Sequence, residues 1–279
     1  MPVIAVIAPG AMGAAVGARL VEHGAEVWTV LAGRSPASAA RAKAAGMMDV
    51  DAQQVSAADI VLSIVPPGEA LALARSLSPV LREAARKPVY ADCNAVSPQT
   101  VAAIAAEVDA AGVRFVDAGI IGGAPKPGTP GPLIYTSGPH APALAMLAQH
   151  GLRVSDLHGP VGAASGLKMS YAGITKGLTA LASAMMLAAT RFGAAPALAA
   201  ELAASQPDLL KHLTRSVPDM YPKAYRWVAE MQEIAAFAGE DAPTRDIYTA
   251  IAALYAGLAQ DAAGPKQEVG ALDAFLGRP

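Results

Sequence analysis

The sequence is poor in cysteine, in aromatic residues and in charge. Among 279 residues there is one cysteine, Cys93, and aromatic residues make up 5% and charged residues 16% of the chain. A single cysteine cannot form an internal disulfide, so we expect a reducing compartment. A formal net charge of −2 argues against nucleic-acid binding, which requires a basic face. An apolar content of 53% argues against disorder.

Long hydrophobic runs are also missing, although the mean hydropathy is +0.36. The apolar stretch from Pro2 to Ala8 is too short for the core of a secretory signal. The longest uncharged candidate for a membrane-spanning helix lies between Lys176 and Arg191, shorter than the roughly 20 residues that such a helix needs. The five histidines show no metal-ligand spacing, so we expect no metal site. These absences favour a soluble, cytoplasmic protein that binds neither membrane nor nucleic acid.

Short apolar strands alternate with helical segments in the first part of the chain. This alternation predicts βαβ units, and therefore an α/β Rossmann-type domain with a mostly parallel sheet over residues 1–160. From 161 to 279 no strand-like run is present, which predicts an all-α domain that begins with a long helix. The expected strands are 3–7, 25–31, 59–65, 88–92, 113–118, 133–137 and 152–155, and helices are expected to end near 23 and to cover 37–45, 97–110 and 141–150.

The first strand leads into a glycine-rich turn that is typical of dinucleotide binding. Gly10 and Gly13 occupy the second and third glycine positions of the G-x-G-x-x-G pattern, whereas the first position is Ala8. Such a turn brings the backbone and a helix N-terminus close to a pyrophosphate. We therefore expect Gly10, Ala11, Met12 and Gly13 to bind the cofactor, although a plain strand-to-helix turn would have the same pattern.

The end of the second strand bears on the choice of cofactor. Sites for NAD usually place an acid there, but Glu26 lies at the start of this strand and Arg34 and Ser35 follow its end. An arginine and a hydroxyl suit a 2′-phosphate. The sequence therefore predicts NADP, with NAD as the alternative if Arg34 is an ordinary loop residue. Asn94 follows a later strand and is a candidate to bond the nicotinamide or its ribose, or a plain turn residue.

Four stretches resemble the β-hydroxyacid dehydrogenase superfamily, which includes 3-hydroxyisobutyrate dehydrogenase and 6-phosphogluconate dehydrogenase. Residues 10–13 match its G-x-M-G turn, and 63–67 (S-I-V-P-P) fall where its cofactor-contacting loop lies. Residues 117–123 (D-A-G-I-I-G-G) are similar to its D-A-P-V-S-G-G substrate loop. Residues 162–168 (G-A-A-S-G-L-K) are similar to its lysine-bearing segment. The resemblance covers essentially the whole chain and indicates a branch with a distinctive helical C-terminal domain.

The resemblance implies an NADP-dependent oxidoreductase that moves a hydride between nicotinamide and a small hydroxy acid or carbonyl compound. It implies Lys168 as the general acid or base, Val65 and Pro66 as cofactor contacts, and Gly122 and Gly123 as substrate contacts. It also implies a homodimer built on the helical domain.

The chain departs from the family at two positions. Ile121 stands where the family has a serine, and Ala172 where it has an asparagine, so substrate recognition differs. Tyr171, next to the second position, is a candidate hydrogen-bonding or acidic group, or a packed residue. An NADPH-dependent imine reductase and a non-catalytic nucleotide-binding protein are therefore the alternatives.

Overall fold

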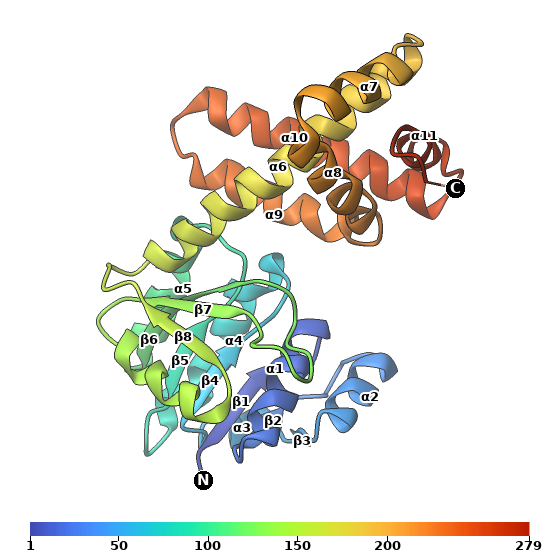
Figure 1. Cartoon of the computed structure of the whole chain (residues 1–279). Helices are drawn as coiled ribbons and strands as arrows, with labels where there is room; N and C mark the ends of the chain where they lie inside the picture. The colour runs from blue at the N-terminus through green and yellow to red at the C-terminus, as the bar shows by residue number, and fades with distance from the viewer. Residues whose placement is uncertain (279) are drawn as a thin grey trace. The chain divides into compact units, whose positions relative to one another are not determined.

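The computed structural model describes residues 1–278 and divides the chain into two compact units, Met1–Met169 and Ser170–Pro279 (Figure 1). Within the described residues, all strands belong to the first unit and the second unit is helical. The predicted fold class, a Rossmann-type α/β domain followed by an all-α domain, is confirmed. The division falls inside helix α6 (Ala163–Arg191), a few residues after the expected boundary at 160.

One sheet forms the centre of the first unit. Its strands are β1 (Val3–Ile7), β2 (Glu26–Thr29), β3 (Met48–Asp49), β4 (Ile60–Ser63), β5 (Val89–Asp92), β6 (Arg114–Ile121), β7 (Leu133–Ser137) and β8 (Arg153–Asp156). Their order is β3-β2-β1-β4-β5-β6-β7-β8, and only the β6–β7 pair is antiparallel. The chain order reverses at β1, which lies between β2 and β4. Open sheets bind ligands at the carboxyl ends of the strands beside such a reversal.

Helices cover both faces of this sheet. One face carries α1 (Ala11–Glu22), α2 (Pro36–Ala44) and the 3₁₀ helix η2 (Ala141–His150). The other carries α3 (Ala52–Val55), α4 (Ala70–Glu83) and α5 (Pro98–Ala110), with the short 3₁₀ helix η1 (Pro67–Glu69) leading into α4. Because both faces are covered, a central strand such as β4 is buried along its whole length and reads as a continuous apolar run.

The second unit consists of the rest of α6 and the shorter helices that follow it. These are α7 (Ala195–Ser205), α8 (Pro207–Met220), the 3₁₀ helix η3 (Tyr221–Lys223), α9 (Ala224–Phe237), α10 (Ala242–Ala263) and α11 (Gln267–Phe275). Helices α7, α8 and α10 each have a proline in the first turn, where the missing N–H removes no intrahelical bond. Helices α9 and α10 pack against each other.

Most expected elements of the first unit are confirmed, and three were missed. The helix expected over 97–110 is α5: Ser97 caps it, with its Oγ accepting from the Thr100 amide at 3.2 Å, and Pro98 is its first residue. The two-residue strand β3 and the four-residue helix α3 are too short to give a periodic signal. Helix α4 contains Pro79, a residue that normally ends a helix, which hides its pattern. The expected helix over 141–150 forms as a 3₁₀ helix.

Helix α6 is the one helix in the described chain that is long and apolar enough to cross a membrane by length and composition. Some 44% of its most apolar window is buried inside the protein. Lys176, in the middle of this helix, forms an ion pair with Glu230 of α9. A buried core helix of a globular protein has these same properties, and the cytoplasmic location stays a prediction.

Candidate functional site

The loop between β1 and α1 carries the predicted phosphate-binding turn. Gly10 is the N-cap of α1, and among the described residues no side chain caps the helix there. A Cβ on Gly10 would lie in open space, whereas one on Gly13 would overlap the carbonyl oxygen of Ala8. Ala11 is exposed, and Met12 packs against the core. The uncapped amides and the open space in front of them fit the pyrophosphate of a dinucleotide.

Two predicted cofactor residues, Arg34 and Ser35, lie between β2 and α2. Ser35 is the N-cap of α2, and its Oγ accepts from the Ser38 amide at 3.3 Å. Nη1 of Arg34 lies 3.5 Å from Oε2 of Glu69, and both side chains are partly exposed. An exposed ion pair of this kind is weak, so the guanidinium can exchange it for a doubly charged phosphate.

A second arginine, Arg41, was missed by the sequence reasoning. Its Nε donates to the carbonyl oxygen of Pro9 at 3.0 Å, and its Nη2 donates to Oγ of Ser38 at 2.9 Å. Arg41 therefore joins α2 to the glycine-rich loop. The three-residue spacing of Ser38 and Arg41 on one helix face was the available signal, but only the folded chain shows that this face meets Pro9. Two arginines and two serines form a cationic, hydroxyl-rich corner that fits a 2′-phosphate.

Four fully buried polar residues lie at one level of the sheet. Ser63, Asp92, Asp117 and Ser137 occupy paired positions on β4, β5, β6 and β7. Because side chains at paired positions of neighbouring strands share a face, these groups form one row near the carboxyl ends of the parallel strands. A row of buried polar groups at this edge is the setting expected for ligand chemistry.

Asn94 extends this row toward the loop that follows β4. Its Oδ1 accepts from the amide of Val65 at 2.6 Å, and its Nδ2 donates to Oγ of Ser63 at 2.8 Å and to Oδ1 of Asp92 at 2.5 Å. Its polar atoms are thus bonded within the protein, and the residue is 2% exposed. Asn94 holds the loop that carries Val65 and Pro66, two predicted cofactor contacts.

Lys168 lies early in α6, against the end of β6. Its Nζ donates to the carbonyl oxygen of Ile120 at 2.8 Å. Burial lowers the pKa of Lys168 to about 8, against the opposing effects of Cys93 and Asp92. Burial raises the pKa of Asp92 to about 7, although the hydrogen bonds from Asn94 and the charge of Lys168 act against that change. A lysine whose pKa lies near neutrality can both give and take a proton.

The predicted substrate loop begins where β6 ends. Gly122 has a φ of +125°, a conformation that favours glycine, and a Cβ there would lie 3.1 Å from Cα of Pro132. Gly123 is exposed, and a Cβ on it would meet open space in the described chain. Ile121 follows Ile120, whose carbonyl oxygen accepts from Lys168, and precedes this loop. It is partly buried. The loop can offer backbone amides to a carboxylate or carbonyl oxygen, but Ile121 adds no polar side chain.

The remaining predicted catalytic residue, Tyr171, lies in the second unit, where its side chain is 52% exposed. The same unit holds a cluster around Lys176, whose Nζ pairs with Glu230 and lies 4.9 Å from the ring centre of Trp227. Trp227 packs edge-on against Tyr255 at 5.3 Å. Lys176 therefore has a structural role, and Trp227 packs inside this unit.

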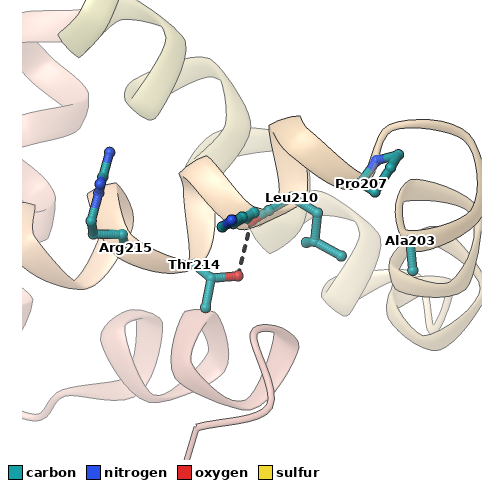
Figure 2. A pocket seen from close by; sticks show the side chains of 6 residues that line it. Ala203, Pro207, Leu210, Thr214 and Arg215 are labelled. Carbon is teal, nitrogen blue, oxygen red and sulfur yellow. Dashed lines mark hydrogen bonds between the residues drawn. The ribbon is translucent and has the colours of Figure 1, made fainter.

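Two surface cavities of the second unit contain none of the predicted site residues. The cavity in Figure 2 has a volume of about 420 Å³ and lies along α8, with Lys211 and Arg215 beside an apolar floor that includes Leu210. The other, of about 480 Å³, lies between α9 and α10, and alanines make up half of its lining. Across residues 1–278, no three His, Cys, Asp or Glu side chains are grouped as metal ligands.

The fold and the turn at Gly10–Gly13 define a dinucleotide-binding protein of the Rossmann type. Residues 3–149, more than half of the chain, match the family described as the NAD binding domain of 6-phosphogluconate dehydrogenase, and the chain belongs to that family. The predicted resemblance is therefore confirmed. Residues 189–258 match a domain of unknown function, DUF1932. Among curated proteins, no match is found.

Three solved structures extend the likeness over nearly the whole chain. The protein MTH1747, of unknown function and described as similar to 3-hydroxyacid dehydrogenases, is 28% identical, with a TM-score of 0.70 over 94% of this chain and 98% of that one. The 3-hydroxyisobutyrate dehydrogenase of Mycobacterium tuberculosis, solved with L-serine, is 18% identical, with a TM-score of 0.73 over 94% and 95%. An imine reductase of Myxococcus stipitatus, in complex with NADP+, is 18% identical, with a TM-score of 0.54 over 99% and 100%. The last two show a shared fold only.

Proposed function

We propose that this protein is an NADP-dependent oxidoreductase that interconverts a small hydroxy acid or other alcohol and its carbonyl form, with Lys168 as the general acid or base. The observation that carries the proposal is the part-buried ammonium of Lys168 at the carboxyl edge of the sheet, which donates to the carbonyl oxygen of Ile120 at 2.8 Å and has its pKa lowered to about 8 by burial. A proton-transfer group matched to neutral pH is what reduction of a carbonyl oxygen needs.

The chain's own residues have three separable tasks in this reaction. The nucleotide, when bound, supplies or accepts the hydride. The first-turn amides of α1 behind Gly10 would hold its pyrophosphate, and Arg34 with Arg41 would hold the 2′-phosphate. Lys168 donates one proton to the carbonyl oxygen as the carbonyl carbon receives the hydride, and it takes that proton back in the oxidation direction. The net reduction thus adds one hydride and one proton.

The substrate differs from those of a plain hydroxy-acid dehydrogenase. The amides of Gly122 and Gly123 suit one carboxylate or carbonyl oxygen. Ile121 and Ala172 replace the polar side chains of the family pattern, so we infer a substrate with a less polar or bulkier body. An imine meets the same description, because its nitrogen accepts the proton in place of the carbonyl oxygen.

A substrate screen tests the proposed reaction. Purified protein is assayed at 340 nm with NADPH against aldehydes, ketones and cyclic imines, and with NADP+ against hydroxy acids. We expect turnover of a carbonyl or hydroxy compound that falls at least 100-fold in Lys168→Met, while Lys211→Met, an exposed lysine of α8, keeps its activity. Turnover of imines alone identifies an imine reductase. Binding of NADPH without any turnover identifies a nucleotide-binding protein, and undiminished activity in Lys168→Met refutes the role of Lys168.

We also propose that the protein is a homodimer through its helical unit. Tyr171, Ile174, Leu178, Leu181 and Met185 follow one another on α6 at alternating spacings of three and four residues, and each is between 38% and 71% exposed. This is the apolar seam of a helix that packs on another helix. The stretch carries no charge except Lys176, which is paired within its own unit, so the face suits a second copy of itself.

Light scattering tests the dimer. We expect the wild-type mass to be twice the 28.1 kDa of one chain. Changing Leu181 and Met185 together to lysine should give a monomer, while Ile247→Lys, an equally exposed apolar position on α10, should not. A wild-type monomer, or a seam variant that stays dimeric, refutes the proposal.

A further inference from the structure

Asp117 is a fully buried carboxylate that binds the beginning of α6 from the middle of β6. Its Oδ2 accepts from the amides of Gly162, Ala164 and Ser165 at 2.9, 3.1 and 3.1 Å, and its Oδ1 accepts from Oγ of Ser165 at 2.6 Å. The first amides of a helix have no partner within the helix, and a negative charge is stabilised at that end. Asp117 therefore caps α6 from a strand 45 residues earlier in the chain.

Ser137 completes this cap. Its Oγ donates to Oδ2 of Asp117 at 2.9 Å and accepts from the amide of Ala164 at 3.0 Å. Both oxygens of Asp117 are thus bonded within the protein, and its exposed fraction is 0%. A carboxylate enclosed in this way does not touch a substrate, so any effect it has on the chemistry passes through α6.

Gly119 allows α6 to lie close to β6. A Cβ at this position would lie 2.9 Å from the carbonyl oxygen of Ala164 and 3.3 Å from Cβ of Lys168. The first distance is shorter than real Cβ contacts, and the atom it meets belongs to the helix backbone, so α6 would have to move. The family pattern D-A-P-V-S-G-G has a proline at this position, so Gly119 is a residue in which this chain departs from that pattern.

These contacts converge on one side chain. Along β6, Asp117 accepts from the first amides of α6, and Gly119, which has no Cβ, leaves room for the helix backbone. The carbonyl of Ile120 accepts from Nζ of Lys168 at 2.8 Å. Lys168 lies three residues after Ser165, within one turn of the capped end. A shift of the helix start therefore moves Lys168 away from the edge of the sheet and toward water.

We propose that Asp117 and Gly119 are positioning residues for Lys168, which fix the start of α6 so that the lysine ammonium stays against the carbonyl oxygen of Ile120 at the carboxyl edge of the sheet. This inference rests on the proposed function for its consequence in catalysis. Its structural claim, that the two residues control the environment of Lys168, can be measured without any substrate.

The test measures how readily Lys168 is acetylated as pH is raised. Trace labelling with acetic anhydride between pH 6 and 11, read by mass spectrometry, gives the protonation midpoint of each lysine, and exposed Lys211 in the same sample is the internal reference. In the wild type we expect a midpoint of about 8 for Lys168, because burial lowers its pKa. In Asp117→Ala and Gly119→Ala we expect the midpoint to rise by at least one pH unit, since Lys168 becomes hydrated. At pH 8 that lowers its labelling relative to Lys211 by about fivefold or more.

Two controls separate positioning from a general loss of structure. Asp117→Asn keeps an oxygen for the three amides and an N–H for Ser165, so we expect a midpoint within half a unit of the wild type. Gly270→Ala in α11, where a Cβ would meet open space in the described chain, should leave Lys168 unchanged. A cooperative melting transition reports that each variant is folded.

Each outcome decides the proposal. An unchanged Lys168 midpoint in folded Gly119→Ala or Asp117→Ala overturns it, and so does a loss of the melting transition in both, because the residues would then support the whole fold. A raised midpoint in folded variants, restored in Asp117→Asn, supports it even if no substrate is found. Where the screen yields a substrate, kcat should fall at least tenfold in Gly119→Ala with the KM for NADPH unchanged. Failure of the proposed function would instead appear as no turnover of any substrate by the wild type, whatever the midpoint of Lys168.

Discussion

Replacing Lys168 by methionine should stabilise the protein at neutral pH while removing its proton donor. Methionine fills a similar unbranched volume without a charge. Burial lowers the pKa of Lys168 from 10.5 to about 8. Since one pKa unit corresponds to about 1.4 kcal/mol, the charged lysine destabilises the folded state by roughly 3 kcal/mol at pH 7.

Two losses offset part of this gain. The carbonyl oxygen of Ile120 loses its hydrogen bond from Lys168, which costs about 1 kcal/mol. Asp92 also loses a positive charge that favours its ionised form. We therefore expect a net stabilisation of about 1 to 2 kcal/mol at pH 7.

The gain in stability from Lys168→Met should depend on pH, and the lowered pKa of Lys168 sets the direction of that dependence. Between about pH 8 and pH 10.5 the unfolded chain binds more protons at Lys168 than the folded chain does. The free energy of unfolding of the wild type therefore rises with pH across this window, and Lys168→Met lacks that rise. The advantage of the variant should shrink as pH increases and disappear near pH 10.5, where only the lost hydrogen bond remains.

Urea denaturation followed by circular dichroism at pH 7 and pH 10 measures this effect. Lys211→Met, a change at an exposed lysine, is the matched control and should change stability by less than about 0.5 kcal/mol at either pH. If Lys168→Met were equally destabilised at both pH values, Lys168 would not be a buried charge, and the reasoning about its pKa would be refuted.

Three further changes probe the cofactor turn and the buried row. Arg34→Asp should weaken NADPH binding about tenfold or more in a fluorescence titration and NADH binding far less, because the lost partner is the 2′-phosphate; equal effects would contradict the NADP assignment. Gly13→Ala should lower both the melting temperature and the NADPH affinity, because its Cβ would overlap the carbonyl oxygen of Ala8, whereas Gly10→Ala should leave the melting temperature unchanged. Asp92→Asn should raise the urea midpoint at pH 8 but not at pH 4: burial raises the pKa of Asp92 from 3.8 to about 7, so the wild type loses stability as pH rises through that window. A gain of the same size at pH 4 would show that Asp92 is not the group responsible.

Local chemistry explains why much of the fold could be predicted. The cap Ser97 and the following Pro98 mark the start of α5 in the sequence itself, and the helix begins there. Apolar runs such as Ile60–Ser63 are strands because both faces of the sheet are covered. Helix α4 was not predicted because Pro79 interrupts its helical pattern. In the structure the packed helix continues past that proline.

The site was predictable where one segment carries the chemistry and not where several segments meet. The turn at Gly10–Gly13 is a local motif, and its residues lie where the motif requires them. Arg41 was missed because its partner, Pro9, is 32 residues away. Asn94 was a candidate either to bond the cofactor or to be a plain turn residue, and the sequence could not show that its amide bonds Ser63 and Asp92, which lie on two different strands.

Amino-acid composition and short-range pattern were enough to establish an α/β unit, a helical unit and a dinucleotide turn, because strands, caps and tight turns are set by neighbouring residues. The environment of Lys168 could not be predicted from composition and short-range pattern. Its lowered pKa arises from burial, and the residues of β6 that lie against the start of α6 are Asp117, Gly119 and Ile120. These residues lie more than 40 positions before their partners in α6, and only the folded chain brings them together.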